Sequence, residues 1–323
     1  DSVKIKSRLI DNSPGLVFNL LTRGNFPALN RYLDILKNIH NYIGDVDLKT
    51  KKLIINIFSR LQTEFVILNL AEELQKGNAD VEVFLSFLGR EIVEPLFKLL
   101  EVLKGHVGRK IVIRTIARLA KDNKAPVIKR LKEKDKMMVE SAILILEEIG
   151  DAESVELLKG ILRREEPALK KFLIESILVV KSSGVRDILI ESMTDPELDI
   201  RVLSLHQMAT TKDKYFVEPI MEIINDKYFK EKAIEEQRAF FYTLADCSDR
   251  RVIEFFRRVL KKWAIFDRKK KWEMKQIAAY ALSRINEPEA RKVIEEGLRS
   301  RSRHMRELCT KILVLIGRQD DQS

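Results

Sequence analysis

Apolar residues recur along this chain at the spacing of helix faces, in segments separated by short polar turns. One such stripe consists of Val139, Ala142, Ile143, Leu146 and Ile149. Residues at positions i, i+3, i+4, i+7 and i+10 lie on one side of an α-helix, so this stripe is typical of a buried helix face. The spacing recurs within residues 252–260 and 278–285. Because no stretch alternates apolar and polar residues with period two, we predict an all-α protein with essentially no strands.

A valine opens these helical segments at a nearly regular interval. The valines are Val93, Val127, Val155, Val185, Val217, Val252 and Val293. Successive valines are separated by 34, 28, 30, 32, 35 and 41 residues. A period of this length is typical of a solenoid, in which helical hairpins stack and each contacts only its neighbours. The pattern therefore predicts an α-solenoid.

The repeats are regular over residues 93–323 and irregular before that. Residues 1–92 are predicted to form an N-terminal helical region of degenerate or capping repeats, because terminal repeats present one face to water. The helices predicted there span about 26–43, 47–61 and 63–76. The longest valine spacing, before the last repeat, indicates a basic insertion at about 262–272. No low-complexity linker divides the chain, so we expect one continuous solenoid.

Proline marks several predicted helix starts. Val93-Glu94-Pro95-Leu96 and Val217-Glu218-Pro219-Ile220 share one pattern at the same place in their repeats. Proline is tolerated in a first helical turn because that amide has no helical partner. The two segments therefore indicate equivalent helix starts.

Three segments carry the most specific pattern of the repeats. They are Asp195-Pro196-Glu197-Leu198-Asp199-Ile200-Arg201, Ile149-Gly150-Asp151-Ala152-Glu153-Ser154-Val155 and residues 278–290. These segments resemble the HEAT family, in particular the bacterial HEAT-like repeats also seen in phycobilisome-lyase-type proteins. The resemblance implies a right-handed superhelix of helical hairpins, with the second helix of each hairpin on the concave side. It also implies that Arg201 and Arg306, at the arginine position of the family, pair with an aspartate in a turn of the neighbouring repeat.

Basic residues outnumber acidic ones, and the surplus is local. The 323 residues carry a formal net charge of +10, and residues 201–323 hold 27 Lys and Arg against 19 Asp and Glu. A second basic block at 104–136 holds 12 basic residues against 3 acidic ones. This asymmetry suggests an acidic partner, which is a protein surface, a nucleic acid or an anionic membrane face. A solvated helical surface is the simpler interpretation.

The sequence also bears on where the protein works. Cys247 and Cys309 are the two cysteines and lie far apart, so we expect a reducing, cytoplasmic setting without a disulfide framework. No apolar run approaches the roughly 18–20 residues that a membrane span needs. The chain begins at Asp1 and not at Met, from which we expect a piece of a longer cytoplasmic protein. No pattern indicates an oligomeric state.

Catalytic and metal-binding patterns are sparse. The four histidines have no second ligand at metal-binding spacing, and the two cysteines lie on apolar helix faces. The segment 105–110 has two glycines but lacks the full phosphate-loop pattern. We therefore expect no catalytic residue, no metal and no cofactor, and we predict that the chain is not an enzyme.

Two basic clusters hold the candidate partner-binding residues. The first lies on one predicted helix face and consists of Lys110, Arg114, Arg118 and Lys121. The second lies in the segment 257–272 and consists of Arg257, Arg258, Lys261, Lys262, Arg268, Lys269, Lys270, Lys271 and Trp272. Trp263, in the same segment, continues the preceding apolar stripe and is predicted to be a core residue.

These residue types allow two functions. The favoured hypothesis is a scaffold of HEAT-like repeats that holds a protein partner on its concave face or on the basic insertion. The alternative is a nucleic-acid-binding, DNA-glycosylase-like HEAT protein, in which Lys and Arg contact phosphates and aromatic side chains stack on bases.

Overall fold

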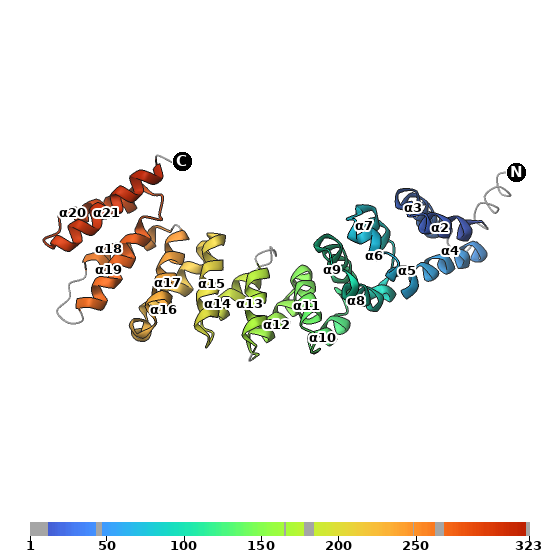
Figure 1. Cartoon of the computed structure of the whole chain (residues 1–323), viewed down its shortest axis with the longest axis horizontal. Coiled ribbons are helices and arrows are strands. Elements are labelled where there is room, and N and C mark those ends of the chain that lie inside the picture. The colour runs from blue at the N-terminus through green and yellow to red at the C-terminus, as the bar shows by residue number, and fades with distance from the viewer. Residues whose placement is uncertain are drawn as a thin grey trace. The chain divides into compact units, whose positions relative to one another are not determined.

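The computed structural model describes residues 12–42, 47–164, 166–177, 184–247, 249–261 and 268–320. All regular structure in these ranges is helical, and they contain no strand, which confirms the predicted all-α class. The chain divides into two compact units, Asp1–Gly150 and Asp151–Ser323. Each unit is a stack of HEAT-like helical hairpins (Figure 1). The predicted boundary at residue 92 stays a prediction.

Unit 1 begins irregularly and becomes regular toward its end. Its helices are α2 (Ser13–Thr22), α3 (Phe26–Tyr42), α4 (Leu48–Leu61), α5 (Glu64–Leu68), α6 (Ala71–Gln75), α7 (Ala79–Ser86), η1 (Arg90–Ile92), α8 (Val93–Val102), α9 (His106–Ala120), α10 (Ala125–Arg130) and α11 (Lys136–Ile149). The last four α-helices form two hairpins, in which α8 packs on α9 and α10 packs on α11. The second helices α9 and α11 also pack on each other, as expected for stacked repeats.

The helix predicted over 63–76 is broken into α5 and α6. At the break the backbone N–H of Leu70 bonds to the carbonyl of Ile67, three residues back, and the side-chain amide of Asn69 donates to the carbonyl of Phe65. The break lets the two short helices reach different partners, since α5 packs on α8 and α6 packs on α9. Gly77, with a positive φ of 75°, then ends α6 as predicted.

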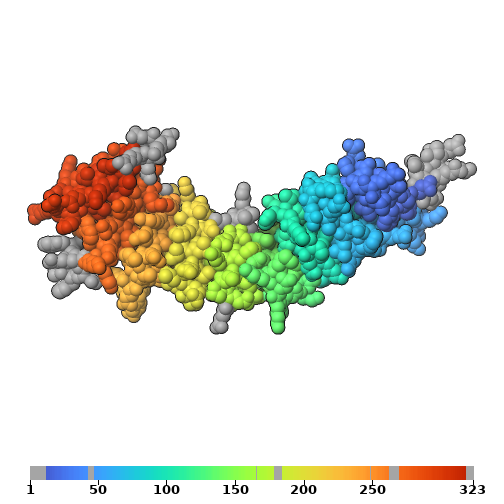
Figure 2. Space-filling model, in the orientation of Figure 1, coloured from blue at the N-terminus to red at the C-terminus, as the bar shows by residue number. Residues whose placement is uncertain are grey.

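The described part of unit 2 forms five hairpins. Its helices are α12 (Ala152–Leu162), α13 (Pro167–Ser176), α14 (Gly184–Ser192), α15 (Leu198–Thr211), η3 (Lys214–Phe216), α16 (Val217–Asn225), η4 (Lys227–Glu231), α17 (Ile234–Asp246), α18 (Arg250–Lys261), α19 (Arg268–Leu282), α20 (Pro288–Leu298) and α21 (Arg303–Asp320). The second helices stack in chain order, because α13 packs on α15, α15 on α17, α17 on α19 and α19 on α21. Figure 2 shows the same order as successive colours along unit 2.

The valine register marks the first helix of each regular hairpin. All seven valines lie in first helices and are at most 8% exposed. Burying each such side chain stabilises the fold by about 1.5–3 kcal/mol. The largest aromatic cluster lies in unit 2, where ring centroids are 5.4–6.2 Å apart. Its members are Phe229, Phe240, Phe241, Phe255 and Phe256.

The shared Val-Glu-Pro pattern marks equivalent helix starts, as predicted. It opens α8 and α16, and each is preceded by a short 3-10 helix. The glutamate also has an equivalent role in both places. Glu94 accepts a bond of 2.6 Å from Arg130, and Glu218 accepts one of 2.8 Å from Arg251. In each case the arginine belongs to the first helix of the next hairpin, so the pattern joins successive first helices.

The connection between the two helices at the predicted basic insertion is shorter than expected. Helix α18 ends at Lys261, and α19 begins at Arg268. Residues 268–272 are therefore the first turns of a helix and not part of a loop. Lys262 and Trp263 lie outside the described residues, as does the side chain of Arg268.

Candidate partner-binding site

The fourth residue of the second helix fixes the turn of several hairpins. These residues are Arg109 in α9, Arg201 in α15, Gln237 in α17 and Arg306 in α21. Each side chain donates to carbonyls of the last turn of the first helix or of the segment that links the two helices. The donor–acceptor distances include 2.6 Å from Arg109 to Leu100 and 2.7 Å from Arg306 to Ser300. Such carbonyls have no helical partner, so the long side chains satisfy them and hold the turn.

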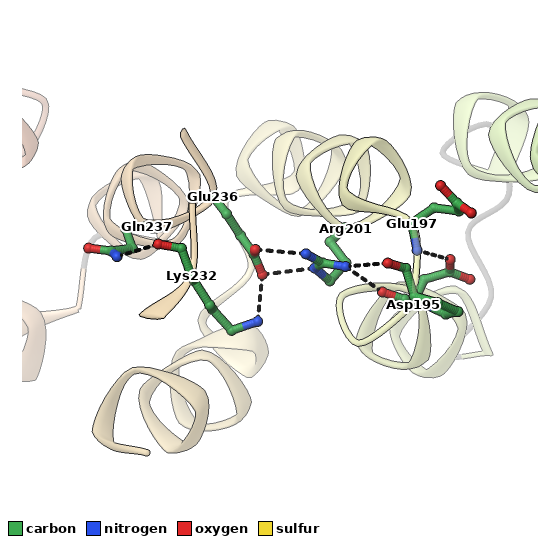
Figure 3. A network of polar contacts seen from close by, with 7 residues as sticks. Asp195, Glu197, Arg201, Lys232, Glu236 and Gln237 are labelled. Carbon is green, nitrogen blue, oxygen red and sulfur yellow. Dashed lines mark hydrogen bonds and ion pairs between the residues drawn. The ribbon is translucent and has the colours of Figure 1, made fainter. Parts of the chain in front are cut away.

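Arg201 extends this arrangement into a network that joins two successive hairpins (Figure 3). Its Nη1 donates to the carbonyls of Asp195 and Pro196 at 2.8 Å each. Its Nε and Nη2 donate to the two carboxylate oxygens of Glu236, also at 2.8 Å. Lys232 donates to Glu236 from the same hairpin at 2.6 Å. The resemblance implied an aspartate in a turn, whereas the partner is a glutamate in the first turn of α17.

The other end of the network is a buried ion pair. Lys170, the fourth residue of α13, donates to a carboxylate oxygen of Asp195 at 2.8 Å. Their side chains are 6% and 4% exposed. The second oxygen of Asp195 accepts the backbone N–H of Glu197 and so begins the next helix. Three consecutive hairpins of unit 2 are thus joined by charge-assisted bonds.

The protonation of the Arg201–Glu236 pair follows from its contacts. Burial alone would raise the pKa of Glu236, but the hydrogen bonds from Arg201 and Lys232 outweigh it and hold the pKa below its ordinary value. The bond to Glu236 raises the pKa of Arg201. Both groups are therefore charged at neutral pH, and the network stabilises the stack and leaves no free acid or base.

The predicted residues of unit 1 lie on or just after α9, and two of them are engaged. Arg114 is 4.0 Å from Glu82 of α7. Arg118 donates to the carbonyl of Leu85 at 2.9 Å, and burial lowers the pKa of its guanidinium. Lys110 and Lys121 are exposed and form no ion pair with the described residues. The sequence could not show the engagement, because Glu82 and Leu85 lie more than thirty residues away.

The predicted residues of unit 2 are divided between two helices. In α18, Arg257 and Lys261 both reach Glu296 of α20, at 3.5 and 3.1 Å, whereas Arg258 is exposed. In α19, Lys269 and Lys270 are exposed and Lys271 is half-buried. Trp272 packs edge-on against the ring of His304 in α21, with centroids 5.9 Å apart. That side chain therefore contributes to packing between second helices.

A groove that the sequence analysis missed lies between α17 and α19. It encloses about 250 Å³, and its lining consists of Ile234, Arg238, Tyr242, Glu273, Gln276, Ile277 and Tyr280. Ile234 is 39% and Tyr280 37% exposed, so apolar surface faces solvent there. Tyr242 of the lining is also contacted by Arg284, which binds Asp246 at 2.6 Å and lies 5.2 Å from the centre of the Tyr242 ring. The signal for this groove in the sequence was Tyr280. It interrupts an alanine-rich stripe of core residues and lies on the side of the helix opposite the core.

The described residues also hold candidate reactive groups. Among them, no three His, Cys, Asp or Glu side chains are grouped so as to hold a metal ion. Cys247 and Cys309 are free and buried. Burial raises the pKa of the Cys247 thiol to about 12 and also raises that of Cys309. Both thiols are protonated at neutral pH, which favours a packing role.

No described helix is by itself long and apolar enough to cross a membrane. The segments Leu48–Leu61 and Glu64–Gln75 meet the length and composition test only together, as a pair bent by 52°.

Solved structures include one that is similar to this chain over most of its length. No protein-family model matches the chain, and no curated protein matches it. Human deoxyhypusine hydroxylase in complex with glycerol is similar at 13% sequence identity and a TM-score of 0.31, covering 80% of this chain and 98% of that one. The prediction that this chain is not an enzyme is corrected here, since the similar structure is that of an enzyme.

Proposed function

We propose that this helical-repeat protein is a HEAT-like scaffold that holds a protein partner on the second helices of unit 2. The groove between α17 and α19 carries the proposal. Tyrosine and arginine are enriched among the residues that contribute most to protein interfaces. Tyr242, Tyr280 and Arg238 line this groove together with the exposed Ile234. Aromatic, apolar and cationic side chains thus converge on one concave surface.

The state of the predicted basic residues also supports a protein partner. Arg257 and Lys261 are bound to Glu296, and Arg118 is bound to a backbone carbonyl. Cations held in this way are less available for phosphate groups, which bind through several free Lys and Arg at once. The two buried, free thiols support a reducing compartment, and we place the protein in the cytoplasm.

Nucleic-acid binding is the second candidate function. The observation that favours it is a set of exposed cations that form no ion pair with described residues, namely Arg258, Lys269 and Lys270. Binding through so few phosphate contacts would be weak and would fall steeply with salt.

Site-specific photo-crosslinking tests the proposal. A photoreactive amino acid replaces Tyr280 in the groove, and a matched variant carries it at Tyr215, which is 49% exposed in η3. After crosslinking in cell extract and nuclease treatment, we expect protein adducts at position 280 and few at position 215. Equal adducts at both positions, or adducts that nuclease removes, would contradict the proposal. A salt titration with duplex and single-stranded DNA then measures the second candidate directly.

A further inference from the structure

We propose that the outer face of α21 is a docking surface for an amphipathic helix of a protein partner, with a carboxylate in the first turn of that helix. Helix α21 is a second helix of unit 2, as is α15, whose outer face is covered by α17. This surface is separate from the groove between α17 and α19, so the two proposals succeed or fail independently.

Arg306 and Arg201 occupy the same position in their helices. Both are fourth residues, and both donate Nη1 to two carbonyls of the preceding link. In Arg201 the remaining edge of the guanidinium, formed by Nε and Nη2, donates to Glu236. This glutamate lies on α17, the second helix of the next hairpin. In Arg306 that edge binds no described residue. Arg306 therefore presents the same donor pair that Arg201 uses to hold the next helix.

Arg109 uses the remaining edge of its guanidinium in the same way, in a different hairpin. Its Nη1 caps the link at Leu100 and Leu103, and its Nη2 donates to the hydroxyl of Ser141 at 2.8 Å. Ser141 lies on α11, the second helix of the next hairpin. In both units, then, the arginine that caps its own turn also binds the following second helix. At α21 the partner helix supplies the acceptor for the Nε and Nη2 groups of Arg306.

Exposed side chains follow Arg306 at helical spacing, and the first of them has a buried counterpart in α15. Leu205 of α15 is fully buried, and the hydroxyl of Thr243 in α17 donates to the carbonyl of Leu205. The equivalent residue of Leu205 in α21 is Thr310, which is exposed. Val314, one turn further, is 51% exposed, and the adjacent Leu315 is 41% exposed. The surface therefore combines an open arginine with uncovered apolar residues.

A shallow groove already marks this face. It encloses about 460 Å³, and its lining consists of Arg303, Arg306, Glu307, Thr310 and Lys311. Arg303 is bound to Glu307 at 2.8 Å, and Arg306 and Lys311 form no ion pair with a residue that the structure describes. The surplus of positive charge selects an acidic helix over a basic one. Apolar residues of the partner helix would cover Val314 and Leu315, in the helix-in-groove mode of recognition.

The probe for this surface is a peptide taken from the chain itself. Residues 232–247 contain α17, which brings Glu236 to Arg201 in the native stack. The peptide is labelled, blocked at both ends and titrated against the full chain by fluorescence anisotropy, with hydrogen exchange to locate the contact. We expect micromolar binding, protection of α21, and at least a tenfold weaker affinity for the Glu236→Gln peptide.

Variants of the full chain distinguish a docked helix from an unspecific contact. Val314→Asp is at an exposed position and is expected to fold, yet it places a charge in the contact and should weaken binding at least tenfold. Leu298→Asp, at a 37% exposed position of α20, is the matched control and should leave binding unchanged. An Arg306→Glu variant should lose the natural peptide and bind one carrying Glu236→Arg.

Three results would overturn the proposal. The first is no binding up to millimolar peptide, and the second is equal binding to Val314→Asp and to the unmodified chain. The third is a concentration-dependent dimer in sedimentation that Val314→Asp abolishes, since the occupant would then be a second copy. Failure of these tests would leave crosslinking at Tyr280 unaffected.

Discussion

Arg201 and Glu236 join two successive hairpins of unit 2 through a two-pronged ion pair, with Nε–Oε1 and Nη2–Oε2 distances of 2.8 Å. The carboxylate side chain is 1% exposed, and the arginine side chain is 17% exposed. Because the same guanidinium also binds the carbonyls of its own turn, one side chain positions a turn and the helix stacked on it. A buried carboxylate held in this way depends on its partners for solvation.

Replacing Arg201 should therefore destabilise unit 2 strongly. Arg201→Ala leaves Glu236 buried with Lys232 alone, and the expected loss in the free energy of unfolding is about 3 kcal/mol. Denaturant titration followed by circular dichroism measures the loss. The control is Arg163→Ala, which removes an exposed pair with Glu191 at 3.5 Å and should cost at most about 1 kcal/mol. Equal losses in the two variants would show that the pair has no special role.

The same pair should make stability depend on pH. The pKa of Glu236 lies below its ordinary value of 4.5 in the folded protein. Its contribution is thus fully present above the unfolded pKa and is lost as pH falls through the folded pKa. The unfolding midpoints of the unmodified chain and Glu236→Gln should differ most at pH 7 and converge as the pH falls below the ordinary pKa of 4.5. A difference that stays constant down to that pH would contradict the assignment.

The periodic pattern predicted the hairpins because the spacing of buried residues within each helix can be read from neighbouring positions in the sequence. Val93 and Val217 begin their helices where the Val-Glu-Pro pattern places them. A periodicity of apolar residues is local information, and a stack of hairpins needs little else. The break near Asn69 escaped this reasoning, since the two short helices pack on different partners, α5 on α8 and α6 on α9, and the apolar spacing does not show those contacts.

The candidate site was less predictable because it depends on contacts between hairpins. Whether Lys261 is free or bound depends on Glu296, which lies on the next first helix. Composition counts both residues but cannot say that they meet. The groove beside Tyr280 likewise requires the register of α19 against α17, which sets which side chains face each other. Charge along the chain therefore overstated the basic surface.

The two thiols should be inert in the folded protein. With the pKa of Cys247 raised to about 12, the fraction of reactive thiolate at pH 8 is on the order of one in ten thousand, and both side chains are buried. Iodoacetamide at pH 8 should therefore modify neither cysteine within an hour and both once urea unfolds the chain. Mass spectrometry counts the adducts. Rapid modification of one native thiol would indicate an activated cysteine.

The packing of α20 on α21 offers a test of a single close contact. A methyl group added at Gly297 would lie 2.3 Å from the sulfur of Cys309, well inside contact distance, but 3.5 Å from its Cβ. Gly297→Ala should therefore cost about 1–3 kcal/mol through overpacking. Cys309→Ala removes the sulfur alone, so the double variant should recover most of that loss. Alanine also favours a helix over glycine by up to about 1 kcal/mol, which adds to the recovery.

Thermal unfolding of the four proteins in this cycle measures the coupling between the two positions. Coupling of at least about 1 kcal/mol is expected for side chains in direct contact. Additive losses in the double variant would mean that the two helices separate to accept the methyl group. In that case α21 would be held less tightly than its stacked position implies, and Val314→Asp would then be a less stringent test of docking on its outer face.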